Sequence, residues 1–193
     1  MPQLKLFIYI LLLLSIFFLS QLMGTFGPYV AASVIIIAAL FFFRWERLEI
    51  LWGKGLWQGA LAAVLIMSAI FILGLVSGGI ALKGISLTLA VIASSGVLQI
   101  LASIGEELSF RGYILGALQK DMGFSLAAVI SSALFSTFHI TSLFTSGISP
   151  VLGIIIGISI FTGGMVLALL VKGYGLQAAV GFHIGWNFIQ YQV

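Results

Sequence analysis

Six polar side chains are notable because they lie within or at the ends of apolar stretches of the sequence. They occur at three separate places and are Glu106, Glu107, Arg111, His139, His183 and Asn187. An ionisable side chain inside a membrane segment costs about 2.5 to 3.5 kcal/mol on insertion scales, and such residues usually face a bundle interior or a water-filled cavity. Convergence on one shared site is therefore the simplest explanation for them.

The stretch EELSFR holds two carboxylates with different expected surroundings. On an α-helix, Glu107 and Arg111 are four residues apart and share a face, in the order that favours an ion pair. Glu106 lies about 100° around the helix from Glu107, so the same pair does not neutralise it. Phe110 and Tyr113 share the expected face of Glu106 and give it an apolar lining, which suits a general base. The spacing thus predicts a structural ion pair and a separate, reactive carboxylate.

Both histidines lie in apolar segments, LFSTFHITSLF and AVGFHIGWNFI. His183 precedes Asn187 by four residues, which places an imidazole and an amide on one helical face as two hydrogen-bond donors. Gly181 and Gly185 lie on another face and predict close helix packing there.

Each polar group also has a plainer explanation. The glutamates fit a solvated helix end, and a buried histidine often bonds a nearby carbonyl.

Together, these groups point to one kind of chemistry. A carboxylate beside a histidine can hold and deprotonate a water molecule, and a histidine with an asparagine can donate to the oxyanion of a tetrahedral intermediate. Those are the groups needed for hydrolysis of an amide bond without a covalent enzyme intermediate.

The composition describes the scaffold that must position these groups. Hydrophobic residues make up 62% of the chain and charged residues 7%, whereas soluble domains are about 25% charged. The sequence therefore predicts an all-α fold, a polytopic transmembrane bundle of about seven helices in a single integral-membrane domain over residues 1–193. Apolar segments near the length that spans a bilayer lie at about 5–23, 28–43, 57–77, 86–105, 124–143, 150–171 and 174–191.

The basic residues predict how the bundle sits in the membrane. With a cytoplasmic N-terminus, the residues on the cytoplasmic side are Lys5, Arg44, Arg47, Lys54, Arg111, Lys120 and Lys172. Only Lys83 would lie on the opposite side of the membrane, and this excess of basic residues on the cytoplasmic side is what the positive-inside rule describes. Lys5 before a long apolar run also fits a signal peptide, but the following LSQLMGTFG lacks a small-residue cleavage pattern, so we expect a retained helix. The scattered charges offer no basic patch for nucleic acid.

Three motifs occur in order on successive predicted helices. EELSFR at 106–111 fits EExxxR, FSTFH at 135–139 fits FxxxH, and HIGWN at 183–187 fits HxxxN. In this combination the chain resembles the CPBP family, the type II CAAX prenyl proteases and bacteriocin-processing intramembrane proteases that are also called Abi proteins. The likeness covers residues 86–193, so the catalytic core is expected in the C-terminal four helices, and residues 1–85 are expected to form accessory membrane helices.

The resemblance implies a metal-independent glutamic endopeptidase that needs no cofactor. The implied catalytic residues are the general base Glu106, the water-positioning His139, and the oxyanion-hole residues His183 and Asn187. The implied structural residues are Glu107, Arg111 and Phe135. We expect a membrane-associated protein or peptide as substrate, a lipid bilayer as surroundings, and a site that opens towards the cytoplasm, in the plasma membrane of a prokaryote.

Three other interpretations stay open at this point. Glu106, His139 and His183 could hold a zinc ion with water as the fourth ligand, although the chain has no HExxH motif. A non-catalytic membrane scaffold or immunity protein could keep the same fold. A proton-coupled transporter also places Glu and His in the membrane, but no inverted repeat is evident in the sequence.

Overall fold

The computed structural model describes residues 2–81, 88–144 and 147–192, and every regular element in these ranges is helical. The longer helices are α1 (Pro2–Ser20), α2 (Gly27–Glu46), α3 (Leu56–Val76), α4 (Leu89–Glu107), α5 (Leu115–Phe144), α6 (Pro150–Tyr174) and α7 (Leu176–Gln192). Two short elements join helices, the 3-10 helix η1 (Gln21–Phe26) and the π-helix η2 (Leu108–Ile114). Each predicted apolar segment corresponds to one of the longer helices. Lys83, which was expected on the side opposite to the other basic residues, lies outside the described residues.

Four helical stretches of the described residues are long and apolar enough to cross a membrane. They are Gln3–Glu46, Leu56–Val76, Ile92–Ile140 and Pro150–Tyr174. This confirms an all-helical membrane protein, but it does not support the predicted count of about seven crossings. Two of the stretches hold more than one helix and bend at a glycine, Gly24 in η1 or Gly123 in α5, and α7 has only 17 residues.

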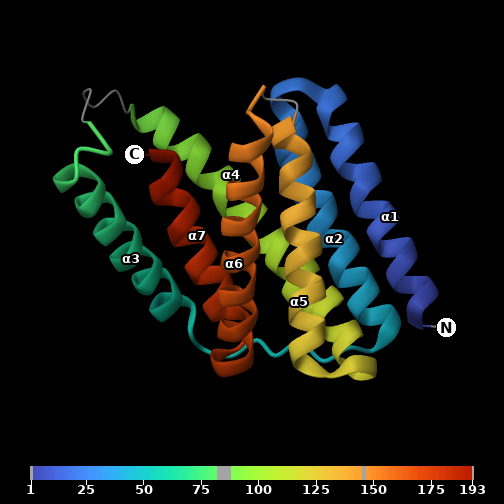
Figure 1. The fold of residues 1–193 in the computed structure, drawn as a ribbon. Coiled ribbons are helices and arrows are strands. Elements are labelled where there is room, and N and C mark those ends of the chain that lie inside the picture. The colour runs from blue at the N-terminus through green and yellow to red at the C-terminus, as the bar shows by residue number, and fades with distance from the viewer. Residues whose placement is uncertain (1, 82–87, 145–146, 193) are drawn as a thin grey trace.

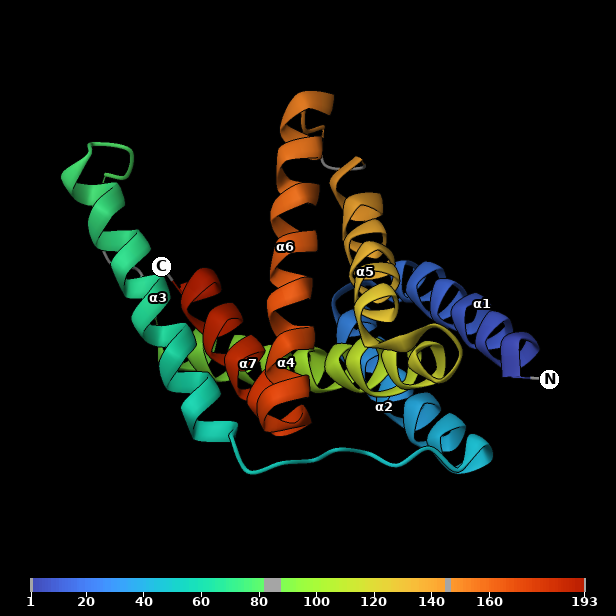
Figure 2. The same cartoon turned by 60° about the horizontal axis from the view of Figure 1, so that its bottom comes forward.

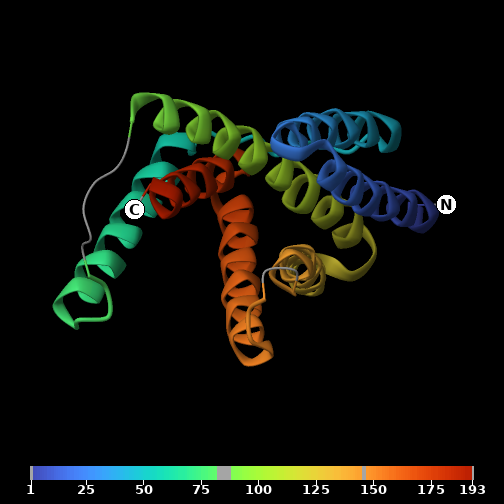
Figure 3. The same cartoon turned by 90° about the horizontal axis from the view of Figure 1, so that it is seen from above.

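The helices form groups that meet around α4 and η2 (Figure 1). α3 packs along α7, α1 packs with α2, and α5 packs along α6. Seen from above, α3 with α7 and α1 with α2 lie on opposite sides, and the α4–η2 segment connects the two sides (Figure 3). Figure 2 shows α4 crossing α6 at a steep angle. η2 directly follows α4 and packs against α2, α5, α6 and α7, so the carboxyl end of α4 lies where these groups meet.

Two glycines allow the chain to change direction within these elements. Gly24 in η1 has φ 55° and Gly123 in α5 has φ 74°, a region of backbone conformation that glycine adopts without steric cost. The bend at Gly123 falls just before 124, where the sequence predicts the start of an apolar segment. The first turns of α5 therefore lead away from η2, and the longer remainder of α5 carries Phe135 and His139 back towards the site.

Close packing between α3 and α7 depends on glycine, as the spacing of Gly181 and Gly185 predicts. A Cβ atom added at Gly181 would overlap the carbonyl oxygen of Leu56, and one added at Gly59 would overlap that of Ala178. These backbone contacts hold α7 at a fixed distance and register against α3. A different face of α7 then presents His183 and Asn187 towards α4.

The helix ends that carry basic residues gather at one end of the bundle. The start of α1, the end of α2, the starts of α3 and α5, and the end of α6 all lie at the lower end in Figure 1. These ends contain or adjoin Lys5, Arg44, Arg47, Lys54, Lys120 and Lys172. Arg111 differs from them, because it is buried inside the bundle.

Candidate active site

Glu106 and Glu107 are the last residues of α4, and the following turn is the π-helix η2 instead of another α-helical turn. Such wider turns frequently occur at functional sites. The turn changes which side chains share a face, so the predicted lining of Glu106 is only partly right. Phe110 lies beside Glu106, whereas the hydroxyl of Tyr113 points elsewhere and donates to Oε1 of Glu46 at 2.6 Å.

Glu107 and Arg111 form the ion pair that their spacing predicts. Nη1 of Arg111 lies 3.2 Å from Oε1 of Glu107, and both side chains are buried. The guanidinium carbon of Arg111 also lies 4.1 Å from the ring centroid of Phe135, within the range of a cation–π contact. Phe135 is itself buried and packs against the ring of His139, so it lies beside the site as expected.

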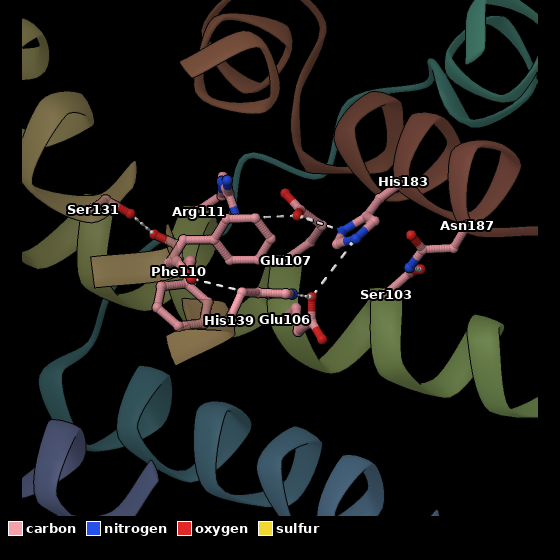
Figure 4. Close-up of polar contacts among 10 residues, drawn as sticks. Ser103, Glu106, Glu107, Phe110, Arg111, Ser131, His139, His183 and Asn187 are labelled. Atoms are coloured by element: carbon pink, nitrogen blue, oxygen red, sulfur yellow. Dashed lines mark hydrogen bonds and ion pairs between the residues drawn. The ribbon is translucent and has the colours of Figure 1, made fainter. Parts of the chain in front are cut away.

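The two histidines converge on Glu106, although they come from different helices (Figure 4). Oε2 of Glu106 lies 3.7 Å from Nε2 of His139 on α5 and 3.6 Å from Nε2 of His183 on α7. About a quarter of the Glu106 side chain and a third of the His139 side chain are exposed, whereas His183 is buried. The site can therefore be reached from the side of Glu106 and His139.

Hydrogen bonds at the far nitrogen of each ring orient the two imidazoles. Nδ1 of His139 donates to the carbonyl oxygen of Phe135 at 2.9 Å, and Nδ1 of His183 donates to Oε1 of Glu107 at 2.9 Å. Both acceptors lack a proton to donate, so Nδ1 carries the hydrogen in each ring. Each Nε2 atom is left facing Glu106. The contact between His183 and Glu107 is not evident from the sequence, since the residues are 76 positions apart.

Asn187 lies one helical turn beyond His183 and contacts α4. Its Nδ2 atom donates to Oγ of Ser103 at 3.3 Å, and Ser103 is fully buried. Ser103 was not singled out from the sequence, although its position three residues before Glu106 places both on one face of α4. Figure 4 shows Asn187 and Ser103 next to each other, on the His183 side of Glu106.

A cavity of about 130 Å³ lies on the other side of Glu106. Its polar lining consists of Glu106, Ser109 and His139. Its apolar lining consists of Leu13 and Phe17 from α1, Ile35 from α2, Phe110 from η2 and Phe138 from α5. The residues from α1 and α2 belong to the segment for which the sequence predicted only an accessory role, and no chemical motif marks them.

A buried hydrogen bond ties α1 to η2 beside this cavity. The hydroxyl of Tyr9 donates to Oγ of Ser109 at 2.7 Å, and both residues are fully buried. Tyr9, Leu13 and Phe17 are spaced by four residues and therefore lie along one face of α1. The sequence signal for this hydrogen bond was Tyr9 itself, a tyrosine in a segment rich in aliphatic residues and phenylalanine, because buried tyrosine hydroxyls usually have a partner.

The site holds several polar atoms that form no hydrogen bond with the described part of the chain. They are Oε2 of Glu106, Oε2 of Glu107, and Nε and Nη2 of Arg111. Among the described residues, no group of three or more His, Cys, Asp or Glu side chains is arranged to hold a metal ion. At Glu106, a carboxylate oxygen faces two imidazole nitrogens, and this arrangement can bind and polarise a small hydrogen-bonding molecule.

Comparisons with known proteins assign the family. The sequence model described as Type II CAAX prenyl endopeptidase Rce1-like matches residues 89–189, just over half of the chain. This range contains all three motifs and confirms the resemblance drawn from them. No curated protein and no solved structure matches the chain significantly. The chain therefore belongs to the Rce1-like family of type II CAAX prenyl endopeptidases, which are membrane proteases.

Proposed function

We propose that the protein is an intramembrane endopeptidase in which Glu106 activates a water molecule for attack on a peptide bond. The observation that carries this proposal is the position of Glu106 Oε2, 3.7 Å from Nε2 of His139 and 3.6 Å from Nε2 of His183. These separations exceed those of direct hydrogen bonds and suit a bridging water. Family membership supports peptide-bond hydrolysis as the reaction.

Glu106 and His139 form the water-activating half of the proposed site. Because Nδ1 of His139 donates to a carbonyl oxygen, Nε2 of the neutral ring is an acceptor. A water molecule can then donate one hydrogen to Glu106 and one to His139, which leaves an oxygen lone pair for the substrate carbonyl. Glu106 takes one proton as the C–O bond forms and returns it to the amine when the C–N bond breaks. The products are a carboxylic acid and an amine, which become a carboxylate and an ammonium when the acid proton passes to the amine, and no covalent enzyme intermediate is needed.

His183 and Asn187 form the oxyanion-stabilising half. Nδ2 of Asn187 carries two hydrogens, of which one goes to Ser103, so the other can reach a substrate oxygen. Glu107 holds the Nδ1 proton of His183, so Nε2 donates to an oxyanion only when the ring carries a second proton. The proposal therefore requires a doubly protonated His183 during turnover. Glu107 would stabilise the charge of that ring.

The proposed substrate is a membrane-associated protein or peptide, cleaved from the cytoplasmic side. The helix ends rich in Lys and Arg gather at one end of the bundle, and the positive-inside rule supports a cytoplasmic position for that end. We propose a single integral-membrane domain without a cofactor, in the plasma membrane of a prokaryote. Four stretches of the described residues are long and apolar enough to cross that membrane.

Mass spectrometry of cleavage products tests the proposal. Purified protein in liposomes is incubated with a library of membrane-anchored peptides, in parallel with Glu106→Gln, which keeps the size of the side chain and removes the base. We expect new peptide termini with the intact protein and none with Glu106→Gln. Products that are equal in both samples, or absent from both, would contradict a glutamate-dependent protease.

Two measurements separate the other interpretations from this one. Metal analysis of active protein addresses zinc: one zinc per chain, with activity lost to a chelator and restored by zinc, would replace the glutamate mechanism. A cellular phenotype that Glu106→Gln leaves unchanged would favour a non-catalytic scaffold. His139→Ala and His183→Ala should abolish cleavage while the protein still elutes as a folded species from size-exclusion chromatography.

A further inference from the structure

Ser132 on α5 and Gly164 on α6 lie near Nη2 of Arg111, the guanidinium nitrogen that does not bond Glu107. Ser132 is fully buried, and Gly164 is also buried. A Cβ atom added at Gly164 would lie 2.9 Å from Nη2 of Arg111 and 3.1 Å from Oγ of Ser132. Both polar atoms therefore lie within about a hydrogen-bond length of one point beside Gly164.

The polar atoms at this place have no partner in the described part of the chain. Nε and Nη2 of Arg111 and Oγ of Ser132 are buried, and none of them forms a hydrogen bond there. The whole Arg111 side chain is only 1% exposed, so bulk water does not solvate its charge. Buried polar groups nearly always have a hydrogen-bond partner, and a buried charge needs one most. We therefore expect a ligand that bonds both Nη2 and Oγ.

Chemistry and size identify this ligand as water. Nη2 only donates hydrogens, whereas a serine hydroxyl can accept or donate, so the ligand must be able to accept from the arginine. Cβ of Ser132 lies 2.9 Å from the point beside Gly164, which leaves no room for a larger molecule. An anion would also meet the negative charge of Glu107, which already pairs with Arg111. A buried water with several polar partners is a regular part of protein structure.

We propose that Ser132, beside Gly164, holds one buried water molecule against Nη2 of Arg111. The water accepts a hydrogen from Nη2 and donates one to Oγ of Ser132. Through this water, Ser132 is a positioning residue for His183. Nη1 of Arg111 bonds Oε1 of Glu107, and the same oxygen accepts from Nδ1 of His183. A guanidinium that is held on both sides keeps this buried carboxylate, and therefore the imidazole, in place.

The helix pair that forms the water site also offers a matched control. Ser136 lies one turn after Ser132 on α5, and its Oγ atom donates to the carbonyl oxygen of Gly157 on α6 at 2.7 Å. Ser136→Ala thus removes a buried hydroxyl between the same two helices, from a bond that does not involve Arg111. Gly164→Ala is a second test variant, because its Cβ atom occupies the point between Nη2 and Oγ while the hydroxyl of Ser132 stays.

NMR of protein labelled with ¹⁵N in arginine tests the water site without any turnover. The chain has three arginines, of which Arg44 and Arg47 are exposed. We expect side-chain N–H signals of Arg111 that exchange slowly with solvent and show a cross-peak to a bound water. Ser132→Ala and Gly164→Ala should each speed this exchange about tenfold or more, the factor expected when a charged group loses a hydrogen bond. Ser136→Ala should leave it unchanged.

The parent protein alone can overturn the inference, so the test does not depend on whether a variant folds. Arg111 signals that exchange as fast as those of Arg44 and Arg47, or that show no cross-peak to water, would mean that no water is held there. Equal exchange rates in the parent and in folded Ser132→Ala would exclude Ser132 as the partner of this water.

Kinetics with a cleaved peptide test the positioning role, which rests on the proposed function. Ser132→Ala should lower kcat about 10-fold to 100-fold with little change in KM, because a small displacement of a catalytic group can cost this much. Ser136→Ala should leave both constants near those of the parent. An unchanged kcat in Ser132→Ala would overturn the positioning role. If the parent cleaves no peptide, the protease proposal fails, and the NMR result still decides the water site.

Discussion

Nδ1 of His183 donates a hydrogen bond to Oε1 of Glu107 across 2.9 Å, although the two residues are 76 positions apart in the sequence. The same oxygen atom accepts a bond from Nη1 of Arg111 at 3.2 Å. One buried carboxylate therefore joins α7 to the start of η2. In enzymes where a carboxylate bonds the far nitrogen of a catalytic imidazole, it fixes the tautomer and orientation of the ring. Glu107 is placed to do this for His183 while it pairs with Arg111.

Glu107→Gln should lower kcat by about 100-fold or more while KM changes little. The amide has nearly the same shape but no charge, and it can donate as well as accept, so it no longer fixes a proton on Nδ1 of His183. Steady-state kinetics in liposomes with a cleaved peptide give the two constants separately. Glu49→Gln is the control, because Glu49 is exposed. An unchanged kcat with a raised KM would show that Glu107 acts on substrate binding and not through the imidazole.

Arg111→Ala should reduce stability more than it reduces the chemistry per folded molecule. Arg111 is 2% exposed, pairs with Glu107 and lies over the ring of Phe135. Removal of one partner from a buried ion pair typically costs about 3 to 5 kcal/mol, because the other charge stays buried. Reversible unfolding in mixed micelles measures the loss, with the exposed Arg44→Ala as control. A variant as stable as the parent would mean that His183 alone compensates the charge of Glu107.

Gly181→Ala should destabilise the packing of α3 against α7. The added Cβ atom would overlap the carbonyl oxygen of Leu56, and this backbone atom moves only if the helices separate. Overpacking of this kind typically costs about 1 to 3 kcal/mol. Gly173→Ala on α6 is the matched control, since no described atom lies within 4 Å of its added Cβ. We expect a lower thermal midpoint in detergent for Gly181→Ala only; equal midpoints for both variants would contradict close packing at this glycine.

Residue spacing was sufficient to predict features that depend on a single helix. The four-residue separation of Glu107 and Arg111 gave their ion pair, and the separation of Gly181 and Gly185 gave the packing face of α7. Helical periodicity fixes such relationships before any tertiary structure forms. The motif order on successive helices also gave the family, which the match to residues 89–189 confirms.

Features that depend on contacts between helices could not be predicted in the same way. The contact of His183 with Glu107 and the contribution of Phe17 to the cavity join segments far apart in the sequence. One local prediction was also wrong for a physical reason. A rotation of 100° per residue placed Tyr113 on the face of Glu106, whereas η2 is a π-helical turn with a wider spacing. The predicted count of about seven crossings is not supported, since the described residues hold four long apolar stretches, two of which bend at Gly24 or Gly123.

Asn187→Ala should lower kcat by about 10² to 10³, the usual cost of one lost oxyanion donor, with little change in stability. Ser103→Ala should have a smaller effect in the same direction, because Asn187 keeps its donors but loses the 3.3 Å contact that orients it. If Ser103 acts only through Asn187, the double variant should be no slower than Asn187→Ala alone, so the two effects are not additive. Kinetics of the four proteins in one liposome preparation measure this coupling. Additive losses would mean that Ser103 reaches the reaction by a route other than Asn187, and an unchanged kcat in Asn187→Ala would remove Asn187 from the oxyanion site.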